Sequence, residues 1–274
     1  MRRTFDAALV FATTLALAFL LLPLLSLFLR VPLATLLSAL GDEAAVDALV
    51  VTVKTGAVAH ALVLLVGTPT AYLLATRRFR GRGALISAIE LPLVLPPAVA
   101  GIALLSLFGR RGLLGEHLEA LGVSIPFTQT AVVLAVAFVS SPFYVRQAIA
   151  AFGAVDPALL DAARTLGAGP ARTFARVALP LAGAGLGAGS ALAWARGVGE
   201  FGATIMFAGS FPGETQTLSL AIYAQLDEDP TVALAIGALL VAFSVAVLFV
   251  VKKLPSWTRF VSSSLIPSAP SSSQ

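Results

Sequence analysis

The stretch DPALLDAARTLGAGPARTFARVALP, residues 156–180, is helix-forming and separates two long apolar runs of the chain. Asp156 and Pro157 form a typical helix start, because Asp caps free N–H groups and Pro fits the first helical position. Gly167 fits the C-terminal cap of this helix, and a second short amphipathic helix is expected over residues 171–177. A connector needs only a few residues. The segment is therefore either a long solvated connector or a structured module that docks to another protein.

The rest of the chain is strongly apolar. Of 274 residues, 58% are hydrophobic and 12% are charged, whereas a soluble domain has about 45–50% apolar and about 25% charged residues. Runs of about 20 apolar residues cross a bilayer as helices. We therefore expect an all-α integral membrane protein in which residues 1–260 form one transmembrane domain and the Ser- and Pro-rich residues 261–274 form a disordered tail. The six expected transmembrane helices cover residues 7–29, 46–76, 84–108, 129–151, 178–209 and 231–251.

The basic residues predict the orientation of these helices. If the N-terminus is inside, thirteen lysines and arginines fall on inner segments and three on outer segments. This bias follows the positive-inside rule and places both termini, and the loop over residues 156–178, in the cytoplasm. The inner set is Arg2, Arg3, Arg77, Arg78, Arg80, Arg82, Arg146, Arg164, Arg172, Arg176, Lys252, Lys253 and Arg259, and the outer set is Arg30, Arg110 and Arg111.

Several kinds of chemistry find no support in the sequence. The chain has no cysteine and only two histidines, His60 and His117, which lie far apart, so we expect no metal site. No P-loop motif is present, so the chain is not expected to bind ATP itself. Residues 183–188 match G-x-G-x-x-A, but they open a membrane helix. There Gly183/Gly187 and Gly185/Gly189 fit small-residue pairs that let helices approach closely. We expect no catalytic residues and no enzymatic activity.

The loop carries a recognisable motif: an Asp-Ala-Ala triplet at 161–163, a glycine four residues later, and Leu179-Pro180 near the next span. This pattern resembles the cytoplasmic signature loop of ABC importer membrane subunits, in which the usual first residue is Glu. The resemblance implies a type I importer permease-like bundle, whose loop helix inserts into a separate ATPase and carries its motion to the spans. The implied coupling residues are Asp161, Ala162, Ala163, Arg164, Leu166, Gly167 and Ala168.

Three further segments resemble the oxyanion branch of these importers, which carries sulfate, thiosulfate, molybdate and tungstate. These are residues 91–101 (LPLVLPPAVAG), residues 125–146 and residues 199–223 (GEFGATIMFAGSFPGETQTLSLAIY). The GEFGA part is shared by sulfate and molybdate members, and TIMFAG resembles the molybdate type. Ser210 and Ser219 depart from the molybdate type, where Asn and Pro are usual. The resemblance implies a molybdate or tungstate importer. A sulfate or thiosulfate permease is the alternative, and an ion-coupled secondary anion carrier is the alternative of a different class.

The resemblance also implies the surroundings of the chain. It implies a multi-pass protein of the prokaryotic plasma (inner) membrane and its lipid bilayer, a second copy of the chain, and an external molybdate-binding protein. Two cytoplasmic ABC ATPase subunits would hold ATP and Mg, while the chain itself would bind no cofactor. No nucleic acid is expected.

Arg196 and Glu200 stand four residues apart within an apolar run, so on a helix their side chains meet. Three interpretations remain open: a structural ion pair, an arginine that attracts a passing dianion, and a glutamate that relays protons. Intramembrane charges of this kind normally face a bundle interior or a water-filled cavity. Glycines in this run and prolines in the third span favour bending or close packing. The candidate pathway or gate residues are Arg196, Glu200, Phe201, Gly202, Thr204 and Met206.

Overall fold

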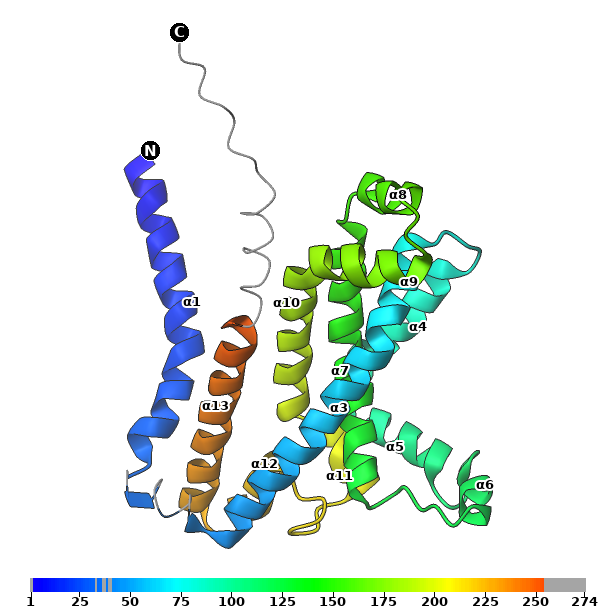
Figure 1. Cartoon of the computed structure of the whole chain (residues 1–274). Helices are drawn as coiled ribbons and strands as arrows, with labels where there is room; N and C mark the ends of the chain where they lie inside the picture. Colours follow the sequence, from blue (N-terminus) through cyan, green and yellow to red (C-terminus); the bar gives the residue numbers. More distant parts are fainter. Residues whose placement is uncertain (1, 33, 36–37, 39–40, 254–274) are drawn as a thin grey trace. The chain divides into compact units, whose positions relative to one another are not determined.

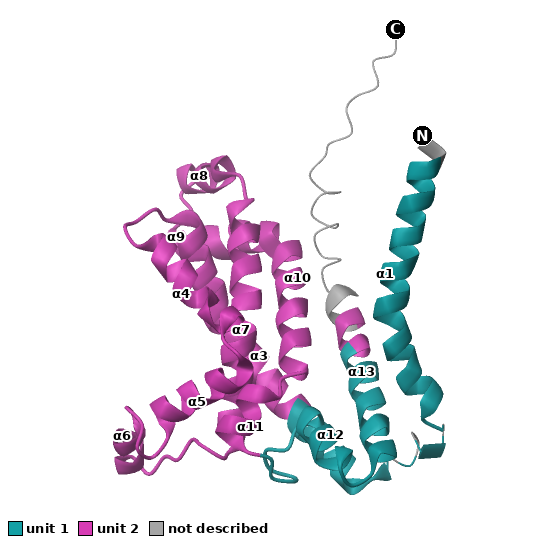
Figure 2. Cartoon of the chain, turned by 180° about the vertical axis from the view of Figure 1, so that it is seen from behind, with its two compact units in different colours: residues 1–52, 210–244 teal, residues 53–209, 245–274 magenta. Residues whose placement is uncertain are grey.

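The structure, a computed structural model of the whole chain, describes residues 2–32, 34–35, 38 and 41–253. The expected disordered tail at 261–274 and the basic residue Arg259 lie outside this part. Every regular element in the described residues is helical. The chain divides into two compact units, residues 1–52 with 210–244 and residues 53–209 with 245–274 (Figure 2).

The first unit has a small apolar core between three helices. It contains α1 (Arg2–Arg30), the start of α3 (Glu43–Thr76), α12 (Leu218–Leu226) and most of α13 (Pro230–Lys253). The core residues are Ala45, Ala48, Leu218, Ala221 and Ile236. Thr52 Oγ1 accepts a 2.9 Å hydrogen bond from the Leu218 N–H, so α3 caps the start of α12. By contrast, the large apolar side chains of α1 are exposed, for example Phe19 at 78%.

The second unit is built around α7 (Gln129–Gly153), whose buried face carries Ala131, Val132, Ala135, Ala148 and Phe152. The remainder of α3 belongs to this unit. Its other helices are α4 (Arg82–Val94), α5 (Pro97–Phe108), α6 (Gly115–Ala120), α8 (Pro157–Thr165), α9 (Pro170–Thr173), a π-helical turn (Phe174–Ala178), α10 (Leu179–Val198) and α11 (Gly202–Ala208).

Close packing of α10 on α7 organises this unit. A Cβ added to Gly185 would lie 2.5 Å from the Ala151 Cβ, and one added to Gly189 would lie 2.9 Å from the Gln147 Cβ. One added to Gly197 would lie 3.0 Å from a methyl carbon of Val136 on α7. These three glycines stand on one face of α10 because they are separated by multiples of four residues. The prediction that Gly185 and Gly189 allow a close helix approach is confirmed.

Five helical stretches in the described part of the chain are long and apolar enough to cross a membrane. Four of them, α1, α3, α7 and α13, cover the expected first, second, fourth and sixth ranges. The fifth stretch runs from Pro170 to Val198. The bent pair of α4 and α5 gives a sixth if it is one span.

The third expected range, residues 84–108, holds two helices, and its prolines, which favour bending, lie at and beside the break. Helices α4 and α5 meet at a bend of 115°. Leu95 and Pro96 are extended at the break, with ψ angles of 133° and 134°. Proline disfavours helical geometry in the residue before it, and it lacks the N–H that would continue the helix. Two consecutive prolines, Pro96 and Pro97, therefore break the span here.

The prediction of one span over residues 178–209 is also only partly correct. Helix α10 ends at Val198, residues 199–201 are not helical, and α11 is a separate short helix. Gly199 is the first residue of this interruption and Gly202 is the first residue of α11. Glycine weakens helices by up to about 1 kcal/mol relative to alanine.

The α7–α10 contact predicts opposite effects for the same substitution at two glycines. Gly185→Ala adds a methyl group where Ala151 already lies, so it should destabilise the protein by about 1–3 kcal/mol. Gly237 in α13 has no atom within 4 Å of an added Cβ. Gly237→Ala should therefore stabilise by about 0.4–1 kcal/mol. Thermal unfolding of both variants in detergent measures the difference, and shifts of equal sign would contradict this packing.

Candidate functional site

The loop between α7 and α10 is an ordered structure rather than a solvated connector. The Asp156 carboxylate accepts a 2.9 Å hydrogen bond from the Ala158 N–H, and Pro157 is the first residue of α8. This is the helix start that the sequence predicts. The side chain of Leu160 is buried, at 6% exposure, and attaches α8 to the rest of the unit.

Gly167 ends α8 in the predicted way. Its φ is +83°, a left-handed conformation that L-residues rarely adopt. The Ala168 N–H donates to the Ala163 carbonyl at 3.0 Å, and the Gly167 N–H donates to the Arg164 carbonyl at 2.9 Å. This pair of bonds is a Schellman-type cap. No atom lies within 4 Å of an added Cβ, so backbone conformation, not space, requires glycine here.

Aromatic side chains fix the second half of the loop to the spans. The Phe174 ring lies 4.8 Å from the Tyr72 ring on α3 and 6.1 Å from the Phe152 ring on α7. Just before it, Thr173 is 1% exposed and its hydroxyl donates to the Gly169 carbonyl at 3.2 Å. Because of these contacts, the second half of the loop cannot shift unless α3 and α7 shift with it.

The outer face of α8 remains open. Leu159 and Leu166 are 48% and 88% exposed, which is unusual for large apolar side chains. Asp161 and Arg164 form an exposed 2.8 Å ion pair on the same helix. Of the predicted coupling residues, Ala163 and Ala168 are half-buried and the other five are exposed. The structure thus brings the predicted set together on one short helix and its cap.

The expected second helix over residues 171–177 is not a separate element. Helix α9, the π-helical turn and α10 follow one another without a break, from Pro170 to Val198. Figure 1 shows that the chain changes direction between α9 and α10. Pro180 has no N–H, so the regular hydrogen-bond ladder cannot continue across this turn. The Leu179 N–H donates instead to the Phe174 carbonyl, five residues back.

At the opposite end of α10, Arg196 and Glu200 form the predicted ion pair. Arg196 Nη2 lies 2.6 Å from Glu200 Oε2, and the two side chains are 28% and 1% exposed. Glu200 is not on the same helix, because α10 ends two residues earlier. Its other oxygen, Oε1, accepts a 2.7 Å hydrogen bond from the Ala203 N–H at the start of α11. One buried carboxylate therefore holds both sides of the helix break.

The remaining pathway candidates fall into two groups. Gly202 lies directly on α5, since an added Cβ would be 2.7 Å from the Pro97 Cβ. Thr204 is fully buried at 0% exposure, so it faces no open path in this structure. Met206 is 39% exposed, and Phe201 is half-buried. Of the six candidates, Glu200 and Thr204 are buried, whereas Arg196, Phe201, Gly202 and Met206 keep exposed surface.

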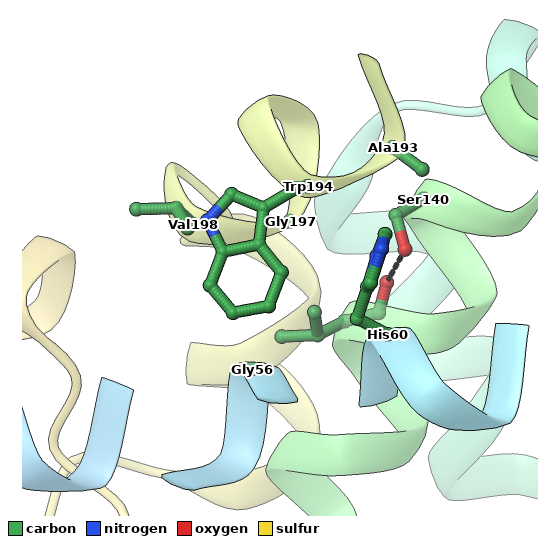
Figure 3. A pocket seen from close by; sticks show the side chains of 8 residues that line it. Gly56, His60, Ser140, Ala193, Trp194, Gly197 and Val198 are labelled. Carbon is green, nitrogen blue, oxygen red and sulfur yellow. Dashed lines mark hydrogen bonds between the residues drawn. The ribbon is translucent and has the colours of Figure 1, made fainter. Parts of the chain in front are cut away.

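A small cavity of about 10 Å³ adjoins this region, between α3, α7 and α10 (Figure 3). His60 and Trp194 line it, with their rings edge to face at 5.1 Å. His60 Nε2 is 2.8 Å from Ser190 Oγ, so a polar contact joins α3 to α10. The volume suits about one water molecule and excludes an oxyanion. Sequence reasoning did not single out this contact, because the partners are 130 residues apart.

Within the residues that the structure describes, no three His, Asp or Glu side chains gather closely enough to hold a metal ion.

Residues 67–260 match the family described as "Binding-protein-dependent transport system inner membrane component". The chain belongs to this family. The permease is thus an inner membrane transport component, and the inner-membrane, multi-pass localisation expected from the sequence is confirmed.

Individual relatives agree with this assignment. The molybdenum transport system permease protein ModB of Mycobacterium tuberculosis is 46% identical over 232 residues, which are 84% of this chain and 87% of that protein. The sulfate transport system permease protein CysT of Synechococcus elongatus is 35% identical over 250 residues, or 87% of each chain. These relatives are permease subunits, so the expectation that this chain is a transport component and not an enzyme is confirmed.

A solved bacterial alginate ABC transporter, in complex with its alginate-bound periplasmic protein, has the same fold. A chain of that transporter superimposes with a TM-score of 0.70 at 15% identity, covering 93% of each chain. The predicted fold class, an all-α membrane protein with the fold of ABC importer permeases, is confirmed.

The Arg196–Glu200 pair makes a prediction that a double-mutant cycle tests. Arg196→Gln leaves the Glu200 carboxylate buried without its cation, and breaking a buried pair costs about 3–5 kcal/mol. Glu200→Gln should cost less, because Arg196 reaches solvent. The double variant should recover most of the loss. Melting temperatures of the four proteins measure the coupling, and losses that simply add would show that the two side chains act independently.

Proposed function

We propose that this permease is the membrane-spanning subunit of an ATP-driven importer that moves molybdate or tungstate inward by alternating access. The observation that carries the proposal is the 46% identity to the Mycobacterium tuberculosis molybdenum permease over 84% of the chain. Residues 199–209, the first part of the segment that resembles these permeases, form the helix break after α10 and helix α11. The residues of this resemblance thus lie at the break that the Arg196–Glu200 pair stabilises.

Two cytoplasmic ATPase subunits would dock on residues 156–178 of two copies of the chain. The support is the exposed face of α8, where Leu159 and Leu166 offer apolar surface beside the Asp161–Arg164 pair. Apolar anchors surrounded by charged groups suit a protein interface. ATP and Mg would be bound by those partners, and this chain would contribute no cofactor site.

Energy from the ATPase would reach the spans through the fixed part of the loop. Phe174 packs on Tyr72 and Phe152, and the same helix continues through the π-helical turn into α10. A displacement of α8 and α9 is therefore passed to α10, whose other end carries Arg196. Closure of the ATPase dimer would turn the pathway outward, and hydrolysis would reset it.

An external binding protein would deliver the anion. The segments expected outside carry mostly carboxylates, including Glu116, Glu119, Glu214 and Asp229. An acidic surface repels free oxyanions. Delivery by a separate protein that encloses the anion suits such a face.

The geometry favours a structural role for Glu200. It favours two roles for Arg196, which would neutralise Glu200 and attract the transported dianion. Both Glu200 oxygens are engaged, one by Arg196 and one by the Ala203 N–H. A proton relay needs an oxygen that is free to exchange protons, so the secondary-carrier alternative is disfavoured. Arg196 is 28% exposed and has further N–H donors, which leaves it able to attract a dianion while it neutralises Glu200.

A sulfate or thiosulfate permease is the second candidate, and the 35% identity to the Synechococcus elongatus sulfate permease over 87% of both chains favours it. Transport in proteoliposomes that contain the permease, its ATPase and its binding protein separates the candidates. We expect uptake of radiolabelled molybdate that requires ATP and resists an excess of sulfate. Stronger competition by sulfate than by molybdate would reverse the substrate assignment, and uptake without ATP would refute the mechanism.

The docking role of α8 makes a separate prediction. Leu166→Glu places a charge on the proposed ATPase interface without touching the core, because Leu166 is 88% exposed. Uptake and co-purification of the ATPase should both fall about tenfold or more, as expected for loss of an apolar anchor. Leu113→Glu is the matched control, since Leu113 is 82% exposed in a segment expected outside. Equal losses in the two variants would remove α8 as the docking site.

A further inference from the structure

A large groove opens beside the bend between α4 and α5. Its volume is about 560 Å³, within the range of about 300–1,000 Å³ that small-molecule sites in proteins occupy. Helices α3, α4, α5 and α7 all line it, through residues that include Val66, Pro92, Phe108 and Phe138 respectively. Figure 1 shows α4 and α5 as two arms that diverge beside α7. The proline break thus creates a groove that a straight span would close.

The groove presents hydrocarbon and no free hydrogen-bond donor. Of the side chains that line it, only Thr70 and Ser141 are polar. The Thr70 hydroxyl donates to the Val66 carbonyl at 2.7 Å, and the Ser141 hydroxyl donates to the Phe138 carbonyl at 3.2 Å. An oxyanion needs donors that replace its hydration shell. The groove therefore does not suit the transported anion, and it suits an apolar occupant.

One end of the groove carries a pair of opposite charges. A second pocket of about 220 Å³ shares Ile89 with the groove and is lined by Glu90 on α4 and Arg146 on α7. Arg146 Nε lies 3.6 Å from Glu90 Oε1, and their side chains are 72% and 36% exposed. This distance gives an ion pair without a hydrogen bond. Both groups therefore keep hydrogen-bonding capacity for a ligand that has both a cation and an anion.

We propose that this groove is a phosphatidylethanolamine site. An acyl chain lies between α4 and α5, the phosphate accepts hydrogen bonds from the Arg146 guanidinium, and the ammonium donates to the Glu90 carboxylate. The match of charges selects this lipid: Arg146 alone fits any phospholipid phosphate, whereas Glu90 fits a primary ammonium and repels a purely anionic headgroup.

The position of the charged pocket assigns the lipid to the cytoplasmic leaflet. Arg146 stands on the last turns of α7, which lead to α8, and Ile86 in the same pocket stands one turn after Arg82 at the start of α4. The distribution of basic residues places this end inside. The acyl chain then runs from the inner headgroup region towards the bend, where it fills the space between the arms and supports their angle.

Native mass spectrometry of the complete complex, released from membranes that contain phosphatidylethanolamine and phosphatidylglycerol, tests the groove. We expect wild-type protein to retain phosphatidylethanolamine. Ala88→Phe fills the groove from α4 and should lower this retention at least about tenfold. Ser87→Phe, an equal enlargement at a neighbouring exposed position that does not line the groove, should retain wild-type amounts. Equal retention by the two variants would overturn the proposal.

Two headgroup variants test the charge match. Arg146→Gln should lower the affinity for both phosphatidylethanolamine and phosphatidylglycerol about tenfold, because a hydrogen bond to a charged group contributes about that factor to binding. Glu90→Gln should lower the affinity for phosphatidylethanolamine alone. The ratio of the affinities for phosphatidylethanolamine and phosphatidylglycerol should therefore fall. An unchanged preference in Glu90→Gln would refute the ammonium contact.

Photolabelling of the wild-type protein tests the groove even if these variants fail to fold. Phosphatidylethanolamine with a photoreactive acyl chain should label peptides of α4 and α5 in the wild-type complex. Labelling spread evenly over all spans would contradict the site.

A second copy of the chain is the competing occupant. Efficient cross-linking of an Ala88→Cys variant to the other copy, with no lipid retained, would assign the groove to that copy instead.

Discussion

The direct contact between α10 and α7 is the constraint on which both candidate functional regions, the loop at 156–178 and the Arg196–Glu200 pair, depend. Gly185, Gly189 and Gly197 present backbone rather than side chains to α7, so the two helices lie closer than larger residues would allow. The contact extends almost from the π-helical turn to the ion pair. Because close-packed interfaces resist gradual deformation, we expect a displacement at one end of α10 to reach its other end.

The breaks in the spans are as informative as the helices. In hydrocarbon every backbone polar group needs an internal partner, so an interruption must supply its own hydrogen bonds. After α10, the Glu200 carboxylate accepts from the Ala203 N–H, and Arg196 neutralises its charge. Between α4 and α5, Pro96 and Pro97 remove N–H groups that would otherwise be unpaired. Before α10, the π-helical turn makes the Leu179 N–H donate to the Phe174 carbonyl. Each break thus has a local physical cause.

Local signals in the sequence predict much of this arrangement. Asp156, Pro157 and Gly167 define α8 through capping and backbone conformation, which depend on neighbouring residues alone. The apolar runs predict four spans because hydrophobic length is a property of the sequence. The prolines of the third span predict that it bends, but the angle of 115° between α4 and α5 does not follow from the sequence, because prolines indicate where a helix can bend and not by how much. The contact of His60 with Ser190 arises from packing between segments that are 130 residues apart. The hydrogen bond from the Ala203 N–H to the Glu200 carboxylate is local, but it depends on α10 ending at Val198, a boundary that the apolar run does not indicate. One sequence without structure does not reveal them.

We expect residues 156–178, the proposed ATPase-docking loop, and the region around Glu200 to move as one mechanical unit. The chain has no cysteine, so a single Met206→Cys substitution gives a specific probe in α11, where Met206 is 39% exposed. The direct measurement is the rate at which a membrane-impermeant thiol reagent modifies this cysteine in the assembled complex, with and without a non-hydrolysable ATP analogue. The account predicts that the analogue changes the rate, and that the change disappears when Leu166→Glu is added. A rate that is the same with and without the analogue would contradict it.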